Sequence, residues 1–257
     1  MSLSDRAFAL LQHLLPKHLL SRVIYALTRS EQVWIRNLVL GIFLRGYRID
    51  MSLAVEKDPY RYPSFNAFFT RALHSTARPI DAAESSLVSP VDGTVSQSGL
   101  ITHDTIVQAK GRDYSMTELL GGDDVRAAKY LGGSFACIYL APYNYHRIHM
   151  PLTGTVRETI YIPGDLFSVN AATARAVPRV FARNERVVCD FVGTPPSNCD
   201  FAMVFVGALH VGSIETTWCG EINPPPRPSK SPEALRAGQG RVLAKGDEAG
   251  RFNMGST

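Results

Sequence analysis

Four residues in this sequence are of the types that a serine-nucleophile reaction uses. Asp92 lies in the stretch SPVDGTV, His146 and His149 lie in YHRIHMP, and Ser256 follows a glycine in the final stretch RFNMGST. A serine hydroxyl attacks a carbonyl when a base removes its proton, and histidine serves as that base because its pKa lies near neutrality. A carboxylate can orient the histidine. The sequence therefore contains the residue types for nucleophilic attack by serine, in segments far apart along the chain.

Each of these residues also has a plainer explanation. The Asp-Gly pair at Asp92 is an ordinary signal for a tight turn. Histidines three residues apart, such as His146 and His149, point to opposite faces of a strand, so they share a cavity only if the chain turns there. Zinc-binding histidines on a helix are four apart, and no third ligand is recognisable, so the pair does not predict a metal site. A Gly-Ser pair near a chain end is typical of a frayed tail.

The composition predicts a folded protein with a core of its own. The chain has 257 residues, 45% of them hydrophobic, which suits one large domain or a core domain with an appendage. The formal net charge of +4 is too small to indicate nucleic acid as a partner. The four cysteines form no Cys-x-x-Cys pair, which favours buried, reduced thiols over disulfides or zinc. No signal peptide is recognisable, so the sequence predicts a cytoplasmic address.

The first 50 residues carry the excess positive charge and have the apolar spacing of amphipathic helices. They contain seven Lys or Arg and three Asp or Glu, a surplus of four that equals the net charge of the whole chain. The longest uncharged apolar run, Leu38 to Leu44, is far shorter than the roughly 18 residues that a membrane-spanning helix needs. Two interpretations stay open: the apolar faces pack on the protein's own core, or they lie in a membrane interface beside anionic lipid.

From about residue 61 the chain changes to short apolar runs separated by Gly and Pro. Examples are LVSPVDGTVSQSG, GSFACIYLAP and FAMVFVGALHVGSIET. This spacing predicts a mostly antiparallel β domain with a few helices, one of which begins at SMTELLGG through a Ser-to-Glu capping pattern. The proline-rich run NPPPRPSKSPEALRAGQG predicts a loop. The expected fold class is therefore α+β, with amphipathic helices at 1–60 and a β-rich domain at 61–257.

Taken in order, several stretches resemble the phosphatidylserine decarboxylase proenzymes. They are FNAFFTRAL with RPID, SPVDGTV, AKGRDYS, LAPYNYHRIHMP, PGDLFSVN, FARNERV, VGSIET, KGDEAGRF and MGST. The resemblance runs from about residue 60 to the end, and the amphipathic N-terminal region fits the same family. Any one stretch is weak evidence, whereas nine in the same order are specific.

The resemblance implies an enzyme precursor that cleaves itself. In this family the bond matching Gly255–Ser256 is cut, and the serine becomes an N-terminal pyruvoyl group. By the same resemblance, Asp92 orients His149, His149 deprotonates Ser256, and His146 serves the later decarboxylation step.

Two departures from the family pattern occur next to the cleavage site. Met254 stands where leucine is commoner, a swap of similar volume. Family proenzymes continue past the serine for some tens of residues as an α chain, whereas this sequence ends at Thr257, so we expect residues 1–255 to form the β chain and the remainder of the α chain to be absent.

The implied activity is decarboxylation of phosphatidylserine to phosphatidylethanolamine. A ketone beside an amide condenses with a primary amine and accepts the electrons released when an α-carboxylate leaves, which suits a substrate with an amine α to a carboxylate. The implied partners are phosphatidylserine, an anionic membrane surface, the protein's own cleaved α chain and a second copy in a homodimer, with no nucleic acid and no metal. The implied location is peripheral, at the cytoplasmic face of the cell membrane. Lys110, Asn170 and Arg183 are candidate headgroup contacts.

Two other functions would use some of the same residues. A non-catalytic lipoyl-type or phosphocarrier domain also has a glycine-rich hairpin like SPVDGTV, but it has no use for MGST. A zinc hydrolase would use His146 and His149 as ligands.

Overall fold

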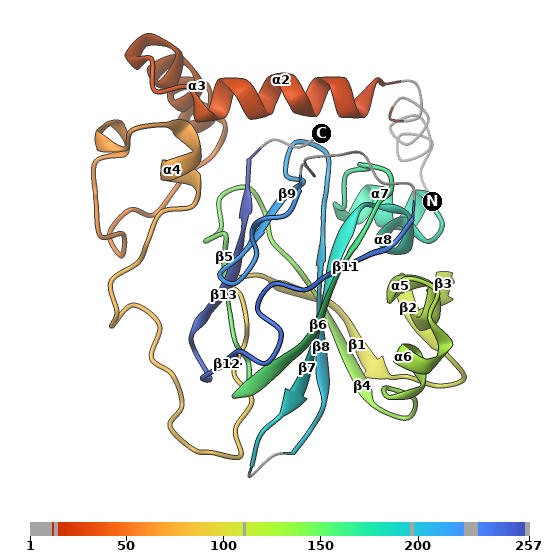
Figure 1. Ribbon diagram of the computed structural model, residues 1–257. Helices are drawn as coiled ribbons and strands as arrows, with labels where there is room; N and C mark the ends of the chain where they lie inside the picture. The colour runs from red at the N-terminus through yellow and green to blue at the C-terminus, as the bar shows by residue number, and fades with distance from the viewer. Residues whose placement is uncertain (1–11, 13–14, 110–111, 196–197, 224–230, 255–257) are drawn as a thin grey trace.

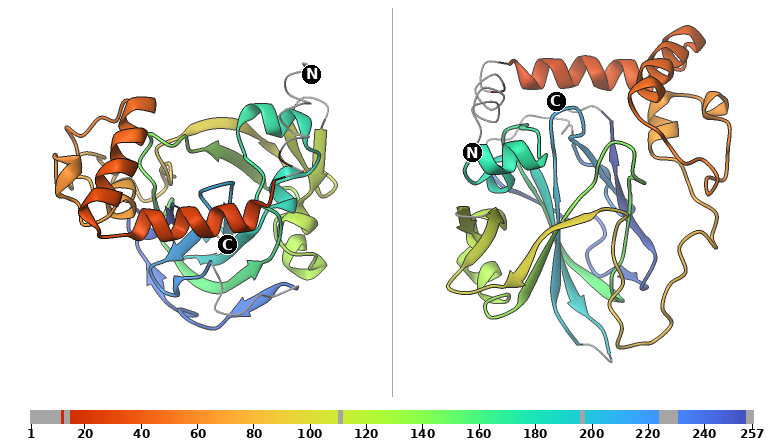
Figure 2. Two further views of the ribbon diagram at one scale, coloured as in Figure 1. Left: turned by 90° about the horizontal axis from the view of Figure 1, so that it is seen from above. Right: turned by 180° about the vertical axis from the view of Figure 1, so that it is seen from behind.

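The computed structural model describes residue 12 and residues 15–109, 112–195, 198–223 and 231–254. Within them, short strands form a β domain, and two longer helices lie across one end of it (Figures 1 and 2). The helices are α2 Lys17–Arg29, α3 Val33–Gly46, the 3₁₀ turn η1 Pro59–Arg61, α4 Phe65–Phe69, α5 Met116–Leu119, α6 Asp124–Ala128, α7 Ala171–Ala176 and α8 Val180–Arg183. The strands are β1 Thr94–Leu100, β2 Thr105–Ala109, β3 Arg112–Ser115, β4 Ser134–Tyr139, β5 Arg147–His149, β6 Gly154–Ile162, β7 Arg186–Gly193, β8 Phe201–Val206, β9 Ser213–Thr216, β10 Gly220–Glu221, β11 Glu233–Leu235, β12 Val242–Leu243 and β13 Glu248–Asn253. The expected α+β class is confirmed.

The central sheet has the order β11-β6-β7-β8, with β12 also paired to β6, and every pairing in it is antiparallel. Strand β7, RVVCDFVG, is buried along most of its length because apolar clusters cover both faces of the sheet. Successive residues of a strand point to opposite faces, and accordingly Val187 and Val188 belong to different clusters. The long apolar runs of the sequence therefore form a two-sided core.

A second sheet, with the order β10-β9-β13-β5, packs against one face of the central sheet. The cluster between the two sheets includes Phe191 and Phe205 from the central sheet and Ile148 and Ile214 from the second. On the other face lie the paired strands β2 and β3 with the short helices α5, α7 and α8. The second sheet thus rests on a rigid support.

Two local predictions concern the ends of elements. Helix α5 begins at Ser115, whose hydroxyl accepts a hydrogen bond from the Glu118 backbone N–H at 3.1 Å, so the capping prediction is confirmed. Gly93 lies where β1 meets β4, and a Cβ there would come within 2.7 Å of the Tyr139 carbonyl oxygen. The glycine of the Asp-Gly pair is therefore required by close backbone approach.

All four cysteines are free thiols. Burial raises the pKa of the Cys137, Cys189 and Cys219 thiols, which favours their protonated form. The expectation of burial is wrong for Cys199, whose side chain is exposed.

An aromatic cluster joins the N-terminal helices to the β domain. Phe43 of α3 packs edge-on against Phe65, Phe68 and Phe69 of α4, with ring centroids 5.1 to 6.3 Å apart. All four rings are buried. Phe69 also stacks on His146, so this cluster reaches the chemistry-bearing residues.

The buried side chains of helix α2 are polar, and several of its apolar side chains face outward. Lys17, Ser21 and Thr28 are buried against the β domain, whereas Leu19 and Val23 are 61% and 49% exposed. The buried Lys17 ammonium binds the Asp165 carboxylate at 3.1 Å. Helix α3 adds further exposed apolar side chains, namely Val33, Trp34, Leu38 and Ile42. On α2, Leu19, Val23 and Leu27 therefore do not pack on the protein's own core, whereas Leu20 and Ile24 are partly buried.

Neither helix is long enough to cross a bilayer. Helix α2 has 13 residues and α3 has 14, and no helix in the described ranges has the length and hydropathy of a membrane span.

Candidate active site

Three of the stretches that resemble the decarboxylase family form adjacent strands of the second sheet. Strand β13, from KGDEAGRF, lies between β5, from YHRIHMP, and β9, from VGSIET. A Cβ on Gly250 would lie 2.3 Å from the Glu215 carbonyl oxygen, so glycine allows β13 to approach β9. These pairings carry the chain past both histidines to Met254, the last residue described.

The register shows where the histidines lie along β13. His149 is opposite Glu248, at the start of the strand, whereas the His146 carbonyl accepts a hydrogen bond from the Phe252 N–H at 3.0 Å, near its end. His146 therefore lies nearer to Met254 along the strand pair. Gly255 and Ser256, the predicted cleavage site, lie outside the described residues.

The His149 ring is held at both nitrogens. Nδ1 lies 2.8 Å from the Gly246 carbonyl oxygen, and Nε2 lies 3.0 Å from the Tyr145 hydroxyl. Because a carbonyl can only accept, we assign the proton of the neutral ring to Nδ1, and the Tyr145 hydroxyl then donates to Nε2. The lone pair of Nε2 is thus the basic site of this histidine.

Asp92 lies in the segment beside His149. The His149 N–H donates to the Pro90 carbonyl at 2.8 Å, which places Asp92 two residues further along. Its carboxylate accepts a hydrogen bond from Arg78 Nε at 2.8 Å and pairs with the same guanidinium through its second oxygen. Burial raises the pKa of Tyr145, and the charge of Asp92 adds to this effect. A contact between Asp92 and the His149 ring stays a prediction.

His146 has different surroundings. Its side chain is 2% exposed, and its ring stacks on Phe69 with centroids 3.9 Å apart. Among the described residues, neither ring nitrogen makes a hydrogen bond of good geometry. The pKa of His146 is lowered to about 3, mainly by burial and in smaller part by the Arg71 charge, while nearby backbone carbonyls oppose this in part. The ring is therefore neutral at physiological pH, with two buried nitrogens open to a ligand.

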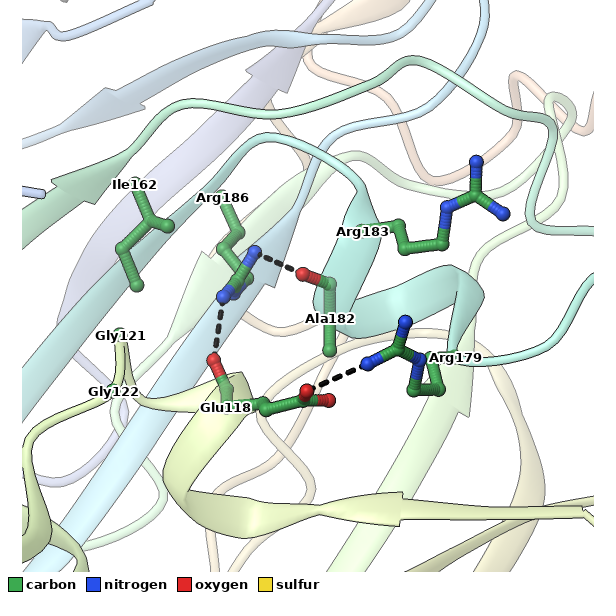
Figure 3. Close-up of a pocket in the computed structure, with 8 residues that line it drawn as sticks. All are labelled: Glu118, Gly121, Gly122, Ile162, Arg179, Ala182, Arg183 and Arg186. Carbon is green, nitrogen blue, oxygen red and sulfur yellow. Dashed lines mark hydrogen bonds and ion pairs between the residues drawn. The ribbon is translucent and has the colours of Figure 1, made fainter. Parts of the chain in front are cut away.

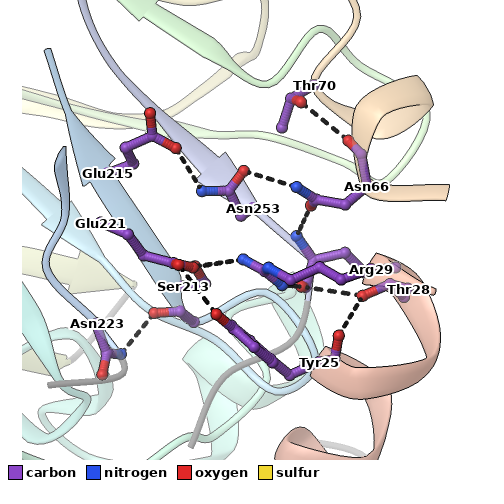
Figure 4. Close-up of polar contacts among 12 residues, drawn as sticks. Tyr25, Thr28, Arg29, Asn66, Thr70, Ser213, Glu215, Glu221, Asn223 and Asn253 are labelled. Atoms are coloured by element: carbon purple, nitrogen blue, oxygen red, sulfur yellow. Dashed lines mark hydrogen bonds and ion pairs between the residues drawn. The ribbon is translucent and has the colours of Figure 1, made fainter. Parts of the chain in front are cut away.

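The N-terminal helices hold the end of the described chain. Arg29 and Thr28 of α2 and Asn66 of α4, which are labelled in Figure 4, bind the backbone of Met254. The sequence reasoning missed these contacts, as it missed Tyr145 and Arg78. Asn66, Arg78 and Tyr145 lie inside the quoted stretches FNAFFTRAL, RPID and LAPYNYHRIHMP, which was the available signal for them.

The candidate headgroup residues have structural contacts in the described chain. Asn170 caps α7 by accepting from the Thr173 N–H at 2.9 Å. Arg183 pairs with Asp165 at 3.3 Å and lies over the Phe167 ring. Lys110 lies outside the described residues. A headgroup role for these residues stays a prediction.

A cavity of about 280 Å³ lies elsewhere, between α5 and α8 (Figure 3). Its three arginines are already engaged: Arg179 pairs with Glu118 at 2.6 Å, Arg183 pairs with Asp165, and Arg186 donates to the backbone carbonyls of Glu118 and Leu119 at 2.6 and 2.7 Å. Burial lowers the pKa of Arg186 to about 10, still well above neutrality. The arginines of this cavity act in packing, and it contains none of the histidines. Across the described ranges, no group of three or more His, Cys, Asp and Glu side chains is arranged to hold a metal ion.

Comparison with known proteins gives matches over nearly the whole chain. The sequence model of a family described as phosphatidylserine decarboxylase matches residues 65–257, and a second model, described as PSD, matches residues 7–48. A phosphatidylserine decarboxylase proenzyme of Alcanivorax borkumensis is 49% identical over 258 residues, covering 100% of this chain and 87% of that protein. Proteins of the same name from Alkalilimnicola ehrlichii and Ectopseudomonas mendocina are each 50% identical, covering 98% and 99% of this chain and 87% and 88% of their own lengths.

The buried state of His146 predicts a pH-dependent stability. The pKa is about 3 in the folded protein against 6.5 for the free side chain, so between these values the unfolded chain binds a proton that the folded chain does not. This residue therefore stabilises the fold fully above pH 6.5 and loses that contribution as pH falls towards 3. Its share of the free energy of unfolding should fall by up to about 1.4 kcal/mol per pH unit in that window.

Urea unfolding of the wild type and of His146→Phe, measured from pH 7 to pH 4, checks this prediction. Phenylalanine keeps a ring against Phe69 but has no titrating group, so the variant should lose stability less steeply with acid. Parallel pH profiles for the two proteins would contradict the assignment.

Proposed function

Because the chain belongs to the phosphatidylserine decarboxylase family, we propose that it converts phosphatidylserine to phosphatidylethanolamine with a pyruvoyl group that it makes from its own Ser256. The observation that carries the proposal is the match to the family over nearly the whole chain, including the Gly255–Ser256 pair. Strand β13 leads towards that pair with His146 nearer to it along the strand than His149, so the role of His149 rests on the family match and not on this register.

The proposed self-cleavage uses Ser256 as nucleophile and His149 as base. The Ser256 Oγ bonds to the Gly255 carbonyl carbon, the peptide C–N bond breaks, and the hydroxyl proton passes through His149 to the departing amine. Loss of the Ser256 α-proton together with the Gly255 carboxylate leaves dehydroalanine, which water converts to the pyruvoyl group and ammonia. The Nε2 lone pair of His149 would be the base, because Nδ1 is bound to the Gly246 carbonyl, and the Tyr145 hydroxyl that donates to Nε2 would have to give way to the Ser256 hydroxyl. Asp92 is proposed to orient the His149 ring.

The buried His146 supports the proposed pyruvoyl site. Its ring nitrogens have no hydrogen-bond partner of good geometry within the described ranges, and its backbone carbonyl is bound by the Phe252 N–H, two residues before Met254. The pyruvoyl group supplies an electrophilic ketone that accepts the electrons of the departing carboxylate. His146, being neutral, would bind the reacting headgroup without adding charge and would pass on a proton from water to the carbon that lost the carboxylate.

The outward apolar face of the N-terminal helices supports a lipid substrate. Phosphatidylserine stays in the bilayer, so the enzyme must meet it at the surface. Leu19, Val23 and Leu27 recur every fourth residue on α2 and are exposed, and Trp34 of α3 is 68% exposed. Apolar side chains within a cationic segment are the features of an interfacial helix. The proposed location is peripheral, on the cytoplasmic face of an anionic membrane, and the homodimer stays a prediction.

Substitutions at Ser256 test the proposed function. In the complete proenzyme, Ser256→Ala should stay one chain and lack activity, because no nucleophile remains. Ser256→Cys should cleave slowly and keep some pyruvoyl, since a thiolate performs the same acyl shift, and Ser256→Thr should rank below it because it yields a bulkier ketone. Intact mass spectrometry measures the fraction of chains that are cleaved. Borohydride reduction in the presence of the substrate amine should trap an adduct on the new N-terminus. A fully active, uncleaved Ser256→Ala protein would overturn the proposal.

Substitutions of the two histidines should affect different steps, self-cleavage for His149 and decarboxylation for His146. His149→Ala should slow self-cleavage by about 10²- to 10⁴-fold, the usual contribution of a general base. His146→Ala should still cleave but decarboxylate poorly. Cleavage is measured by mass spectrometry and decarboxylation by release of labelled CO₂ per pyruvoyl group. Two uncleaved variants, or two active ones, would remove this assignment.

The exposed face of α2 should bind lipid. Replacing Leu19, Val23 and Leu27 together with serine should weaken sedimentation with anionic vesicles by roughly tenfold or more, because the apolar area available for insertion is lost. Thermal stability should be nearly unchanged, since these side chains are exposed. The matched control replaces the exposed Val125 and Leu131 of the β domain with serine. Equal vesicle binding by both variants and the wild type would argue against this face.

A further inference from the structure

Side chains of α2 and α4 bind both backbone groups of Met254, and Figure 4 labels these side chains as Thr28, Arg29 and Asn66. The Met254 N–H donates to Asn66 Oδ1 at 2.8 Å. The Met254 carbonyl accepts from Arg29 Nη1 at 2.8 Å and from Thr28 Oγ1 at 3.3 Å. This carbonyl belongs to the peptide group directly before Gly255. Residues more than 180 positions away in the sequence thus fix the chain next to the predicted cleavage site.

The Arg29 side chain is itself held in place. Its Nη2 donates to Ser213 Oγ at 3.1 Å and pairs with the Glu221 carboxylate. Its guanidinium lies 3.5 Å from the centroid of the Tyr25 ring, and the Tyr25 hydroxyl donates to Glu221 at 3.0 Å. A guanidinium fixed by a carboxylate, a hydroxyl and an aromatic face loses little further freedom when it binds the Met254 carbonyl.

Asn66 makes a second fixed contact. Its Nδ2 donates to Asn253 Oδ1 at 3.0 Å, and Asn253 Nδ2 donates to Glu215 Oε2 at 3.0 Å. This chain of amides joins α4 to β13 and then to β9. The two contacts approach Met254 from different elements, so together they fix both the position and the direction of its peptide groups.

We propose that Arg29, supported by Thr28 and Asn66, is a positioning residue for self-cleavage. This inference rests on the proposed function. An acyl shift requires the serine oxygen and the glycine carbonyl carbon to be held about 3 to 3.5 Å apart, and a misplacement of about 1 Å can cost 10²-fold in rate. A charge-assisted hydrogen bond from Arg29 anchors the residue before that carbonyl. The chain therefore becomes competent to cleave itself only when α2 has docked on the β domain.

The test compares self-cleavage rates of complete proenzymes made by a short pulse of cell-free synthesis. Arg29→Gln should cleave about 10- to 100-fold more slowly than the wild type, and Arg29→Lys should have an intermediate rate. Asn66→Ser should also cleave more slowly than the wild type, because it loses the hydrogen bond from the Met254 N–H. The matched control is Arg61→Gln, because Arg61 is exposed on η1 and makes only long ion pairs with Glu56 and Asp58. Intact mass spectrometry follows the two products with time.

Two further readouts distinguish positioning from a general loss of structure. Methylguanidine at millimolar concentration should accelerate cleavage of Arg29→Ala, because it can replace the missing donor. Once cleaved, Arg29→Gln should decarboxylate at nearly the wild-type rate per pyruvoyl group. Slow cleavage with a lowered melting temperature and no rescue by methylguanidine would overturn the inference, as would equal half-times for Arg29→Gln and the wild type. A wild-type proenzyme that never cleaves would instead overturn the proposed function, and this inference with it.

Discussion

Strand β13 is paired on both sides, and the candidate active site depends on this double pairing. Its partners β5 and β9 come from segments about 100 and 35 residues earlier in the chain, yet all three lie in one sheet. The tight approach at Gly250 leaves no room for a side chain, so the register is strongly constrained. This arrangement places His149 beside one end of β13 and His146 near the other end. It also determines where the chain leaves the sheet, at Met254.

The environments of the two histidines show how one short strand can supply two kinds of imidazole. His149 has a hydroxyl and a carbonyl as partners, which fixes its tautomer and leaves a defined basic nitrogen. His146 lies against Phe69 with no good partner among the described residues, and burial keeps it neutral. The difference arises from the packing of α4 on β5, because Phe69 covers His146 and not His149. A hydrogen-bonded imidazole and a buried, neutral one thus lie within four residues of the chain.

Much of the fold could be predicted from the sequence, because it depends on local signals. The helical spacing near the N-terminus, the Ser115 cap and the antiparallel strands all follow from patterns within a few residues. Residue types also indicated Asp92 and both histidines as candidates. Contacts made across long sequence separations could not be predicted this way: the partner of Asp92 is Arg78, and Met254 is held by Arg29, and neither pairing has a spacing rule. The sequence also could not predict which face of α2 packs on the β domain, because an amphipathic pattern does not specify which face is buried.

The inward polar face of α2 has a consequence for how the molecule sits on a surface. A helix that packs through apolar side chains can slide or rotate at little cost in free energy, because apolar contacts are not directional. The bonds of α2 to the β domain are directional: Lys17 to Asp165 at one end, Tyr25 to Glu221 in the middle and Arg29 to Ser213 at the other. Turning the helix by a single residue, about 100°, would break all three. These contacts therefore fix the rotation of α2 about its own axis. If the outer face of α2 binds a surface, the β domain has one fixed orientation relative to that surface.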